Sequence, residues 1–262
     1  LLYRHLTPHH PDPLPMHSTY DLIVIGGGSG GIAMANRAAS YGAKVALIEA
    51  GRLGGTCVNV GCVPKKIMWN AASIAHVFHE AGDYGFTAKV ERFDWGALKK
   101  SRDDYVAWLN GRYQAGLEKN GVEWMRGRAR FDGPRAITVN GSRLEAPNIA
   151  IATGGRPIMP MWKGAELGIT SDGFFELPRQ PRRVAIVGAG YVAVELAGVF
   201  RALGSEVALL VRRSSVLMSF DELLREAVMR EMAADGIEIH TNTHVREAVR
   251  ETSGITLRRI EG

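Results

Sequence analysis

Two cysteines, Cys57 and Cys62, are the residues best suited to redox chemistry in this chain. They stand in the segment GGTCVNVGCVPKK, residues 54–66, and the 262-residue chain has no others. Two cysteines are too few for a disulfide-stapled scaffold or a four-cysteine zinc site, and we expect no metal site. Their spacing also differs from the Cys-x-x-Cys of thioredoxin-like motifs. The chemistry that remains is a dithiol that passes on two electrons by thiol–disulfide exchange.

A first glycine-rich loop precedes the cysteines. Gly26-x-Gly28-x-x-Gly31 follows an apolar strand predicted over 21–25 and opens a helix. The first glycine allows a tight turn, the second lets the backbone approach a pyrophosphate, and the third permits close packing of helix on strand. Glu49 ends the next strand, where a carboxylate can accept hydrogen bonds from ribose hydroxyls. The pattern predicts a dinucleotide site, and the alternative is a glycine turn in an α/β fold without a ligand.

A second loop repeats the design about 160 residues later. Gly188-x-Gly190-x-x-Ala193 again lies between a strand and a helix, but its next strand ends in Arg212 and Arg213. A guanidinium pairs with a nucleotide 2′-phosphate, which a carboxylate at that place would repel. We therefore predict NADPH over NADH at this loop. The alternative is that the two arginines are only a solvated strand end.

These loops predict an α/β protein with two Rossmann-like nucleotide-binding domains. The domain limits are expected at 18–157 and 158–262, after a disordered tail over 1–17 that is rich in proline and histidine. Met16 is the suspected natural start. Helices are expected over 31–41, 64–80, 95–120 and 221–234, with another that follows the loop of 188–193 and ends near 203. Strands are expected over 21–25, 44–50, 123–131, 136–139, 148–151, 183–187, 206–211, 237–240, 245–250 and 255–260.

Charge and hydropathy exclude several classes of function. Lys and Arg number 32 and Asp and Glu 27, for a formal net charge of +5, and the two signs are interspersed. A nucleic-acid-binding face should be clustered, so no nucleic-acid partner is expected. No apolar run approaches the roughly 18 residues of a spanning helix, and the N-terminal segment lacks the apolar core of a secretory signal. We expect no membrane partner and a cytoplasmic location.

The motifs together resemble one enzyme family. GGTCVNVGCVPKK, with the upstream IGGGSGG, the central ATGG and the later GAGYVAVELAG, is similar to the pyridine nucleotide–disulfide oxidoreductases from about Thr19 onward. The resemblance implies FAD at the first loop, NADPH at the second and glutathione disulfide as substrate. Lipoamide dehydrogenases usually have Pro-Ser-Lys where this chain has Pro64-Lys65-Lys66. The alternatives are a trypanothione, thioredoxin, mercuric or lipoamide type of reductase, or a non-catalytic nucleotide-binding fragment.

The resemblance also implies roles for individual residues. Cys62 corresponds to the flavin-proximal thiol, Cys57 to the interchange thiol, and Lys65 to a flavin contact paired with Glu195. Alternatively, Glu195 is only a surface partner, and Tyr113 and Tyr191 only pack into the core. The implied cofactor contacts are Gly26, Gly28, Ser29, Gly30, Gly31, Glu49, Thr56, Cys57, Lys65, Ala129, Thr153 and Gly154 for FAD, and Gly188, Ala189, Gly190, Tyr191, Val192, Glu195, Arg212 and Arg213 for NADPH; the implied substrate contacts are Ser29, Asn36, Arg37 and Tyr113.

Two departures from the family pattern affect these expectations. The family has a second arginine where this chain has Met218 in VRRSSVLMSFD, so NADPH preference is expected to persist with weaker 2′-phosphate contacts. The resemblance also implies that the second domain is incomplete and that the C-terminal dimerisation domain, which carries a His–Glu acid/base pair, is absent. A homodimer is expected for a full-length protein, and low or no activity for this chain alone.

Overall fold

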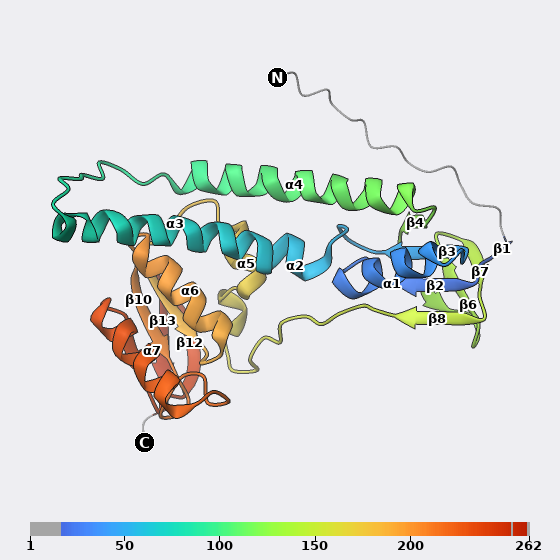
Figure 1. Cartoon of the computed structure of the whole chain (residues 1–262). Helices are drawn as coiled ribbons and strands as arrows, with labels where there is room; N and C mark the ends of the chain where they lie inside the picture. Colours follow the sequence, from blue (N-terminus) through green and yellow to red (C-terminus); the bar gives the residue numbers. More distant parts are fainter. Residues whose placement is uncertain (1–16, 253, 261–262) are drawn as a thin grey trace. The chain divides into compact units, whose positions relative to one another are not determined.

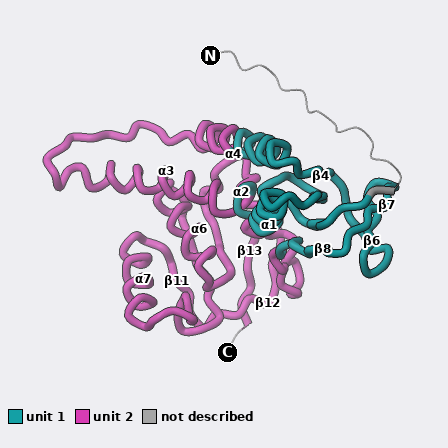
Figure 2. Tube along the Cα trace, turned by 45° about the vertical axis from the view of Figure 1, so that its right-hand side comes forward, with its two compact units in different colours: residues 1–59, 106–155 teal, residues 60–105, 156–262 magenta. Residues whose placement is uncertain are grey.

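The chain contains two parallel β-sheets, and in each of them a strand leads through a glycine loop into a helix (Figure 1). The structure is a computed structural model that describes residues 17–252 and 254–260. The chain forms two compact units, one of residues 1–59 and 106–155 and the other of 60–105 and 156–262 (Figure 2). The α/β class is confirmed, and the domain limits expected from the sequence stay a prediction.

The first unit contains a parallel sheet with strand order β4-β3-β2-β8. Apolar residues on these strands and on the first helix, α1, form its core, in which Val24 and Leu47 are fully buried. Because all four strands are parallel, their carboxyl ends lie at one edge, where the first glycine loop follows β2. The elements are β2 (Leu22–Ile25), α1 (Ser29–Ser40), β3 (Val45–Glu49), β4 (Glu123–Arg126) and β8 (Asn148–Ile151).

A second sheet in this unit has the order β1-β7-β6-β5. Its strands are β1 (His17–Thr19), β5 (Arg130–Phe131), β6 (Ala136–Val139) and β7 (Ser142–Glu145). The strand expected over 123–131 is wrong as one element, because β4 pairs with β3 while β5 pairs with β6. Of the tail expected over 1–17, residues 1–16, including Met16, lie outside the described residues, and residue 17 belongs to β1.

The second unit repeats the arrangement with a parallel sheet of order β11-β10-β9 and an antiparallel hairpin of β12 and β13. These strands are β9 (Arg183–Val187), β10 (Glu206–Leu210), β11 (Glu238–His240), β12 (Val245–Glu251) and β13 (Gly254–Arg259). The helices are α3 (Cys62–Glu80), α5 (Ser171–Glu176), α6 (Tyr191–Ala202) and α7 (Glu222–Ala234), with short 3-10 turns η1 (Ala81–Tyr84) and η2 (Ala165–Leu167).

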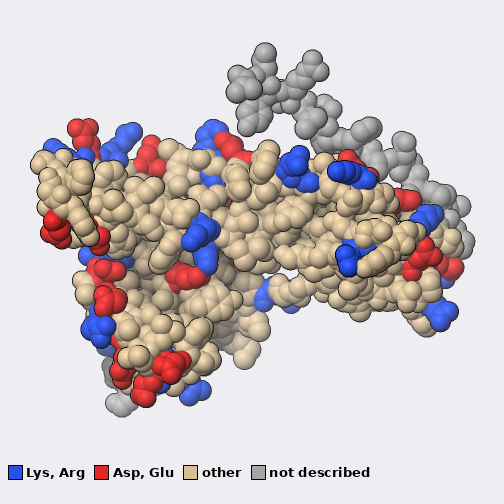
Figure 3. All heavy atoms as spheres, in the orientation of Figure 1, with Lys and Arg blue, Asp and Glu red and all other residues tan. Residues whose placement is uncertain are grey.

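Two further helices link the units along the chain: α2 (Gly55–Val60) and α4 (Trp95–Lys119). Within the second unit, α3 packs on α6 because Met68 and Ala72 join Leu196 and Phe200 in one apolar core. None of the helices in the described part of the chain is long and apolar enough to cross a membrane. Acidic and basic side chains are interspersed on the face drawn in Figure 3.

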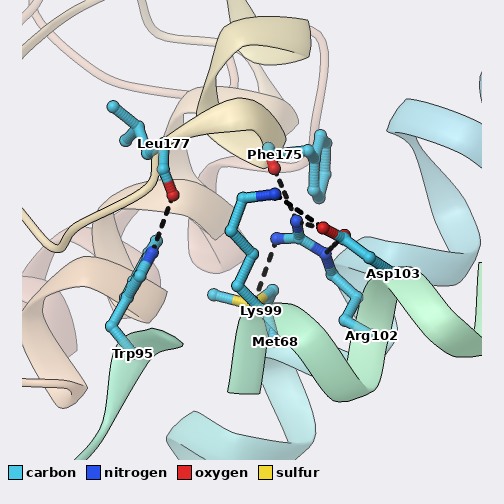
Figure 4. Close-up of polar contacts among 7 residues, drawn as sticks. All are labelled: Met68, Trp95, Lys99, Arg102, Asp103, Phe175 and Leu177. Carbon is cyan, nitrogen blue, oxygen red and sulfur yellow. Dashed lines mark hydrogen bonds and ion pairs between the residues drawn. The ribbon is translucent and has the colours of Figure 1, made fainter. Parts of the chain in front are cut away.

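Asp103 on α4 gives the second unit a pH-dependent contact (Figure 4). Burial raises the pKa of Asp103, but hydrogen bonds from Lys99 and Arg102 outweigh it and hold the pKa below its usual value. A lowered carboxyl pKa in the folded state contributes stability above the unfolded pKa of about 3.9, and this contribution is lost as the pH falls through the folded value.

We therefore predict that Asp103→Asn flattens the loss of stability between pH 6 and pH 3. The effect should stay below about 1 kcal/mol because the Asp103 side chain is 46% exposed. Urea denaturation at pH 6, 4 and 3 measures it. Asp104→Asn, which removes an exposed pair with Lys100, is the matched control. Equal pH slopes for wild type and Asp103→Asn would contradict the prediction.

Candidate functional site

The first glycine loop turns tightly between β2 and α1. Gly26 adopts φ +113°, and a Cβ there would overlap the Ala152 carbonyl; a Cβ on Gly31 would overlap the Gly26 carbonyl and lie 3.3 Å from Val24 Cγ1. No side chain caps α1 at Gly28. The first backbone N–H groups of the helix are therefore available to an anionic ligand.

Glu49 fastens the loop to the end of β3. Its Oε2 accepts a hydrogen bond from Gly27 N at 2.6 Å, and its Oε1 accepts one from Gly51 N at 2.6 Å. The carboxylate therefore fixes the loop backbone from the position expected to face a ribose. Gly54 N also donates to Gly27 O at 2.8 Å, which joins the start of the cysteine segment to the same loop.

Cys57 lies half-buried on α2, in a turn that two asparagines stabilise. The Asn59 amide donates to the Gly55 carbonyl at 2.9 Å and to the Leu53 carbonyl at 3.1 Å, and the Asn110 amide donates to Leu53 at 2.8 Å and to Asn59 Oδ1 at 3.1 Å. The sequence reasoning missed both residues. The position of Asn59 between the two cysteines was the signal that could have found it.

Cys62 is the exposed first residue of α3, where no side chain caps the helix. The N-terminal end of a helix attracts negative charge. One turn later, Lys65 Nζ lies 2.6 Å from Glu195 Oε1 of α6, and both side chains are about one-third exposed. This is the pairing that the resemblance implied, and it joins the helix of Cys62 to the helix of the second glycine loop.

The second glycine loop borders a cleft of about 810 Å³. No side chain caps α6 at Gly190, so its first N–H groups are available to a phosphate. Tyr191, 64% exposed, lies at the start of this helix. The cleft brings together most of the residues predicted for the second nucleotide: Gly188, Ala189, Gly190, Tyr191, Arg212 and Arg213, with Met218. Val192 borders the larger neighbouring pocket.

The other residues predicted to contact FAD or the substrate range from half-buried to exposed. Tyr113 is half-buried against one apolar core of the first unit, and Ala129 packs against the other, which residues of both sheets form. Asn36 accepts a hydrogen bond from Asn120 at 2.9 Å, and the exposed Arg37 lies over the Tyr41 ring at 4.8 Å. Ser29, Gly30, Thr56, Thr153 and Gly154 are exposed. Within residues 17–252 and 254–260, no group of three His, Cys, Asp or Glu side chains could hold a metal ion.

Comparison with known proteins places these features in one family. The sequence profile of the pyridine nucleotide-disulphide oxidoreductases matches residues 20–261. The chain belongs to this family. A glutathione reductase of Schizosaccharomyces pombe is 52% identical over 238 residues, which cover 87% of this chain and 51% of the relative. A glutathione reductase of Yarrowia lipolytica is 47% identical over 249 residues, covering 90% of this chain and 53% of the relative.

Family membership explains why the chain has two glycine loops with a dithiol segment between them. The chain spans about half the length of the curated relatives that it matches.

Proposed function

We propose that this chain carries the flavin, nicotinamide and dithiol parts of an NADPH-dependent glutathione-disulfide reductase. The observation that carries the proposal is the ion pair of Lys65 and Glu195 one turn after Cys62, on a chain whose relatives are named glutathione reductases. This pair joins the helix of a redox cysteine to the helix of a nucleotide loop. Such an arrangement suits electron transfer from a dinucleotide to a disulfide.

The first unit fits the adenosine and pyrophosphate of FAD. Gly26 and Gly31 let the loop, β2 and α1 pack closely, and the uncapped start of α1 offers N–H groups to the phosphates. Glu49 would hold the ribose, with further contacts from Ser29, Gly30, Thr56, Ala129, Thr153 and Gly154. When bound, the flavin supplies a two-electron relay between the nicotinamide and the dithiol.

The second unit fits NADPH by charge. Arg212 and Arg213 line the cleft beside the loop, where they would pair with a 2′-phosphate, and the start of α6 would hold the pyrophosphate. Tyr191 would cover the nicotinamide pocket and move when the nucleotide binds. Glu195 holds Lys65, whose ammonium would stabilise negative charge on a reduced flavin and on the nearby sulfur.

The dithiol reduces the substrate in two exchange steps. The Cys57 thiolate attacks one sulfur of glutathione disulfide, forms a mixed disulfide and releases one glutathione thiolate, which takes up a proton. The Cys62 thiolate then attacks Cys57 Sγ, which releases the second glutathione and leaves a Cys57–Cys62 disulfide. Two electrons pass from the cysteines to the substrate, and NADPH restores the dithiol. Arg37, exposed on α1, would attract the carboxylates of glutathione.

Reduction of the flavin-loaded chain with NADPH tests the assignment of the two cysteines. Wild type is expected to develop long-wavelength charge-transfer absorbance between the Cys62 thiolate and the oxidised flavin. Cys57→Ser should keep this band, and Cys62→Ser should lose it. Loss of the band in Cys57→Ser alone would overturn the assignment.

The same variants test the substrate by intact mass. Flavin-loaded Cys62→Ser mixed with glutathione disulfide should retain one glutathione on Cys57, since the resolving thiol is missing. Cys57→Ser, the matched control, should retain little. An adduct from lipoamide, with none from glutathione disulfide, would favour a different reductase of this family.

A further inference from the structure

The cleft beside the second glycine loop has a cationic wall that includes a histidine. His244 lines the cleft together with Arg212 and Arg213. Backbone hydrogen bonds fix the two segments side by side: Thr243 N donates to Val211 O at 2.9 Å, and Asn242 N donates to Arg213 O at 3.0 Å. These bonds bring the backbone of His244 close to the arginine pair, although the residue lies about thirty positions away in the sequence.

The cleft is also lined by a methionine that has an arginine behind it. Leu217 N donates to Ala189 O at 2.7 Å, which fastens the methionine segment to the glycine loop. Met218 lines the cleft and is 46% exposed, and Arg225 of α7 directs its Nη1 to Met218 Sδ at 3.4 Å. Asp221, at the start of α7, accepts a hydrogen bond from Leu223 N at 2.9 Å.

Arg225 has a donor without an acceptor. In the described part of the chain, its Nε is the one buried side-chain nitrogen or oxygen that lacks a hydrogen-bond partner. A thioether is a weak acceptor, so the contact with Met218 leaves most of the hydrogen-bonding capacity of the guanidinium unused. A buried unsatisfied donor is unfavourable, and an anion that displaces the Met218 side chain would satisfy it.

We propose that His244 and Arg225 are specificity-determining residues for a 2′-phosphorylated adenine nucleotide. The inference rests on the proposed NADPH site. A phosphate monoester has three terminal oxygens, each of which can accept more than one hydrogen bond, so residues besides Arg212 and Arg213 can also donate to it. His244 would donate from the segment beside the arginine pair. Arg225, which lies behind Met218, would donate once the Met218 side chain moves aside.

Binding of adenosine 2′,5′-bisphosphate and adenosine 5′-monophosphate to the chain, by calorimetry, tests this proposal. The ratio of the two dissociation constants measures recognition of the 2′-phosphate alone. His244→Gln and Arg225→Met are each expected to lower the preference for the bisphosphate by about three- to tenfold. Binding of the monophosphate should be unchanged. His244→Arg and Arg225→Lys, which keep a hydrogen-bond donor at each position, should retain most of the preference.

Arg230→Gln is the matched control, since Arg230 lies exposed on the same helix and pairs with Glu231. It should leave both constants unchanged. If wild type prefers the bisphosphate and Arg212→Gln removes the preference, while His244→Gln and Arg225→Met keep the wild-type ratio, our inference is wrong and the proposed NADPH site stands. If wild type binds both probes equally, the proposed NADPH site itself fails, and the inference fails with it.

Discussion

Replacing Gly31 by alanine is expected to destabilise the first unit by about 3 kcal/mol and to abolish flavin binding. The added Cβ would overlap the Gly26 carbonyl oxygen, lie 3.0 Å from the Gly26 carbonyl carbon and press on Val24, which is fully buried. The Gly26 carbonyl and the Gly31 backbone cannot move apart without displacing α1 from β2. Because the start of α1 is also the proposed phosphate site, the same shift would disrupt the cofactor pocket.

Gly30→Ala is the matched control for this substitution. A Cβ on Gly30 meets no heavy atom within 4 Å, although Gly30 directly precedes Gly31 in the same helix. Alanine favours a helix over glycine by up to about 1 kcal/mol, so Gly30→Ala should keep or raise stability. Urea denaturation of the two variants without cofactor measures the difference. Equal stabilities would show that the close contact of helix and loop is not what requires Gly31.

The glycine loops could be predicted because local sequence determines them. A short apolar strand, a tight turn and a helix start need particular residues within about ten positions, and the spacing of Gly26, Gly28 and Gly31 supplies them. The charge difference between Glu49 and Arg212 could also be read from the sequence, since Glu49 ends β3 and Arg212 follows the end of β10 by two residues. Fold class and family follow from these local signals.

Features that depend on distant pairing could not be predicted. Strand β7, with the sequence SRLE, has a single apolar residue, Leu144, and forms because β1 and β6 both pair with it. The break between β4 and β5 arises because each strand pairs in a different sheet. Likewise, the Asn110 contact with the Asn59 turn joins residues 51 positions apart. The alternation of polar and apolar residues within these segments does not identify their distant partners.

Arg102 is a further case in which polarity alone suggests a solvent-facing side chain and the fold buries it. It lies on α4 and is 1% exposed, among side chains of α3 and α5 (Figure 4). Its guanidinium donates to the Phe175 carbonyl at 2.5 Å, to Asp103 Oδ1 at 2.6 Å and to Met68 Sδ at 3.7 Å, and it lies over the Phe175 ring at 5.6 Å. One buried cation thus joins three helices, of which α3 begins with Cys62.

Arg102→Met is therefore expected to lower the free energy of unfolding of the second unit by about 3 kcal/mol. Methionine fills a similar volume, but it leaves the buried Phe175 carbonyl without its donor. It also removes the hydrogen bonds that Arg102 donates to the Asp103 carboxylate. Arg102→Lys should lie between the two, because one ammonium cannot reach all three acceptors as the planar guanidinium does. Lys100→Met, which removes an exposed pair on the same helix, should change stability by no more than about 0.5 kcal/mol. Urea denaturation at pH 7 measures the series. Wild-type stability of Arg102→Met would mean that apolar packing alone holds α3, α4 and α5 together, and that the buried charge contributes nothing to keeping the helix of Cys62 in place.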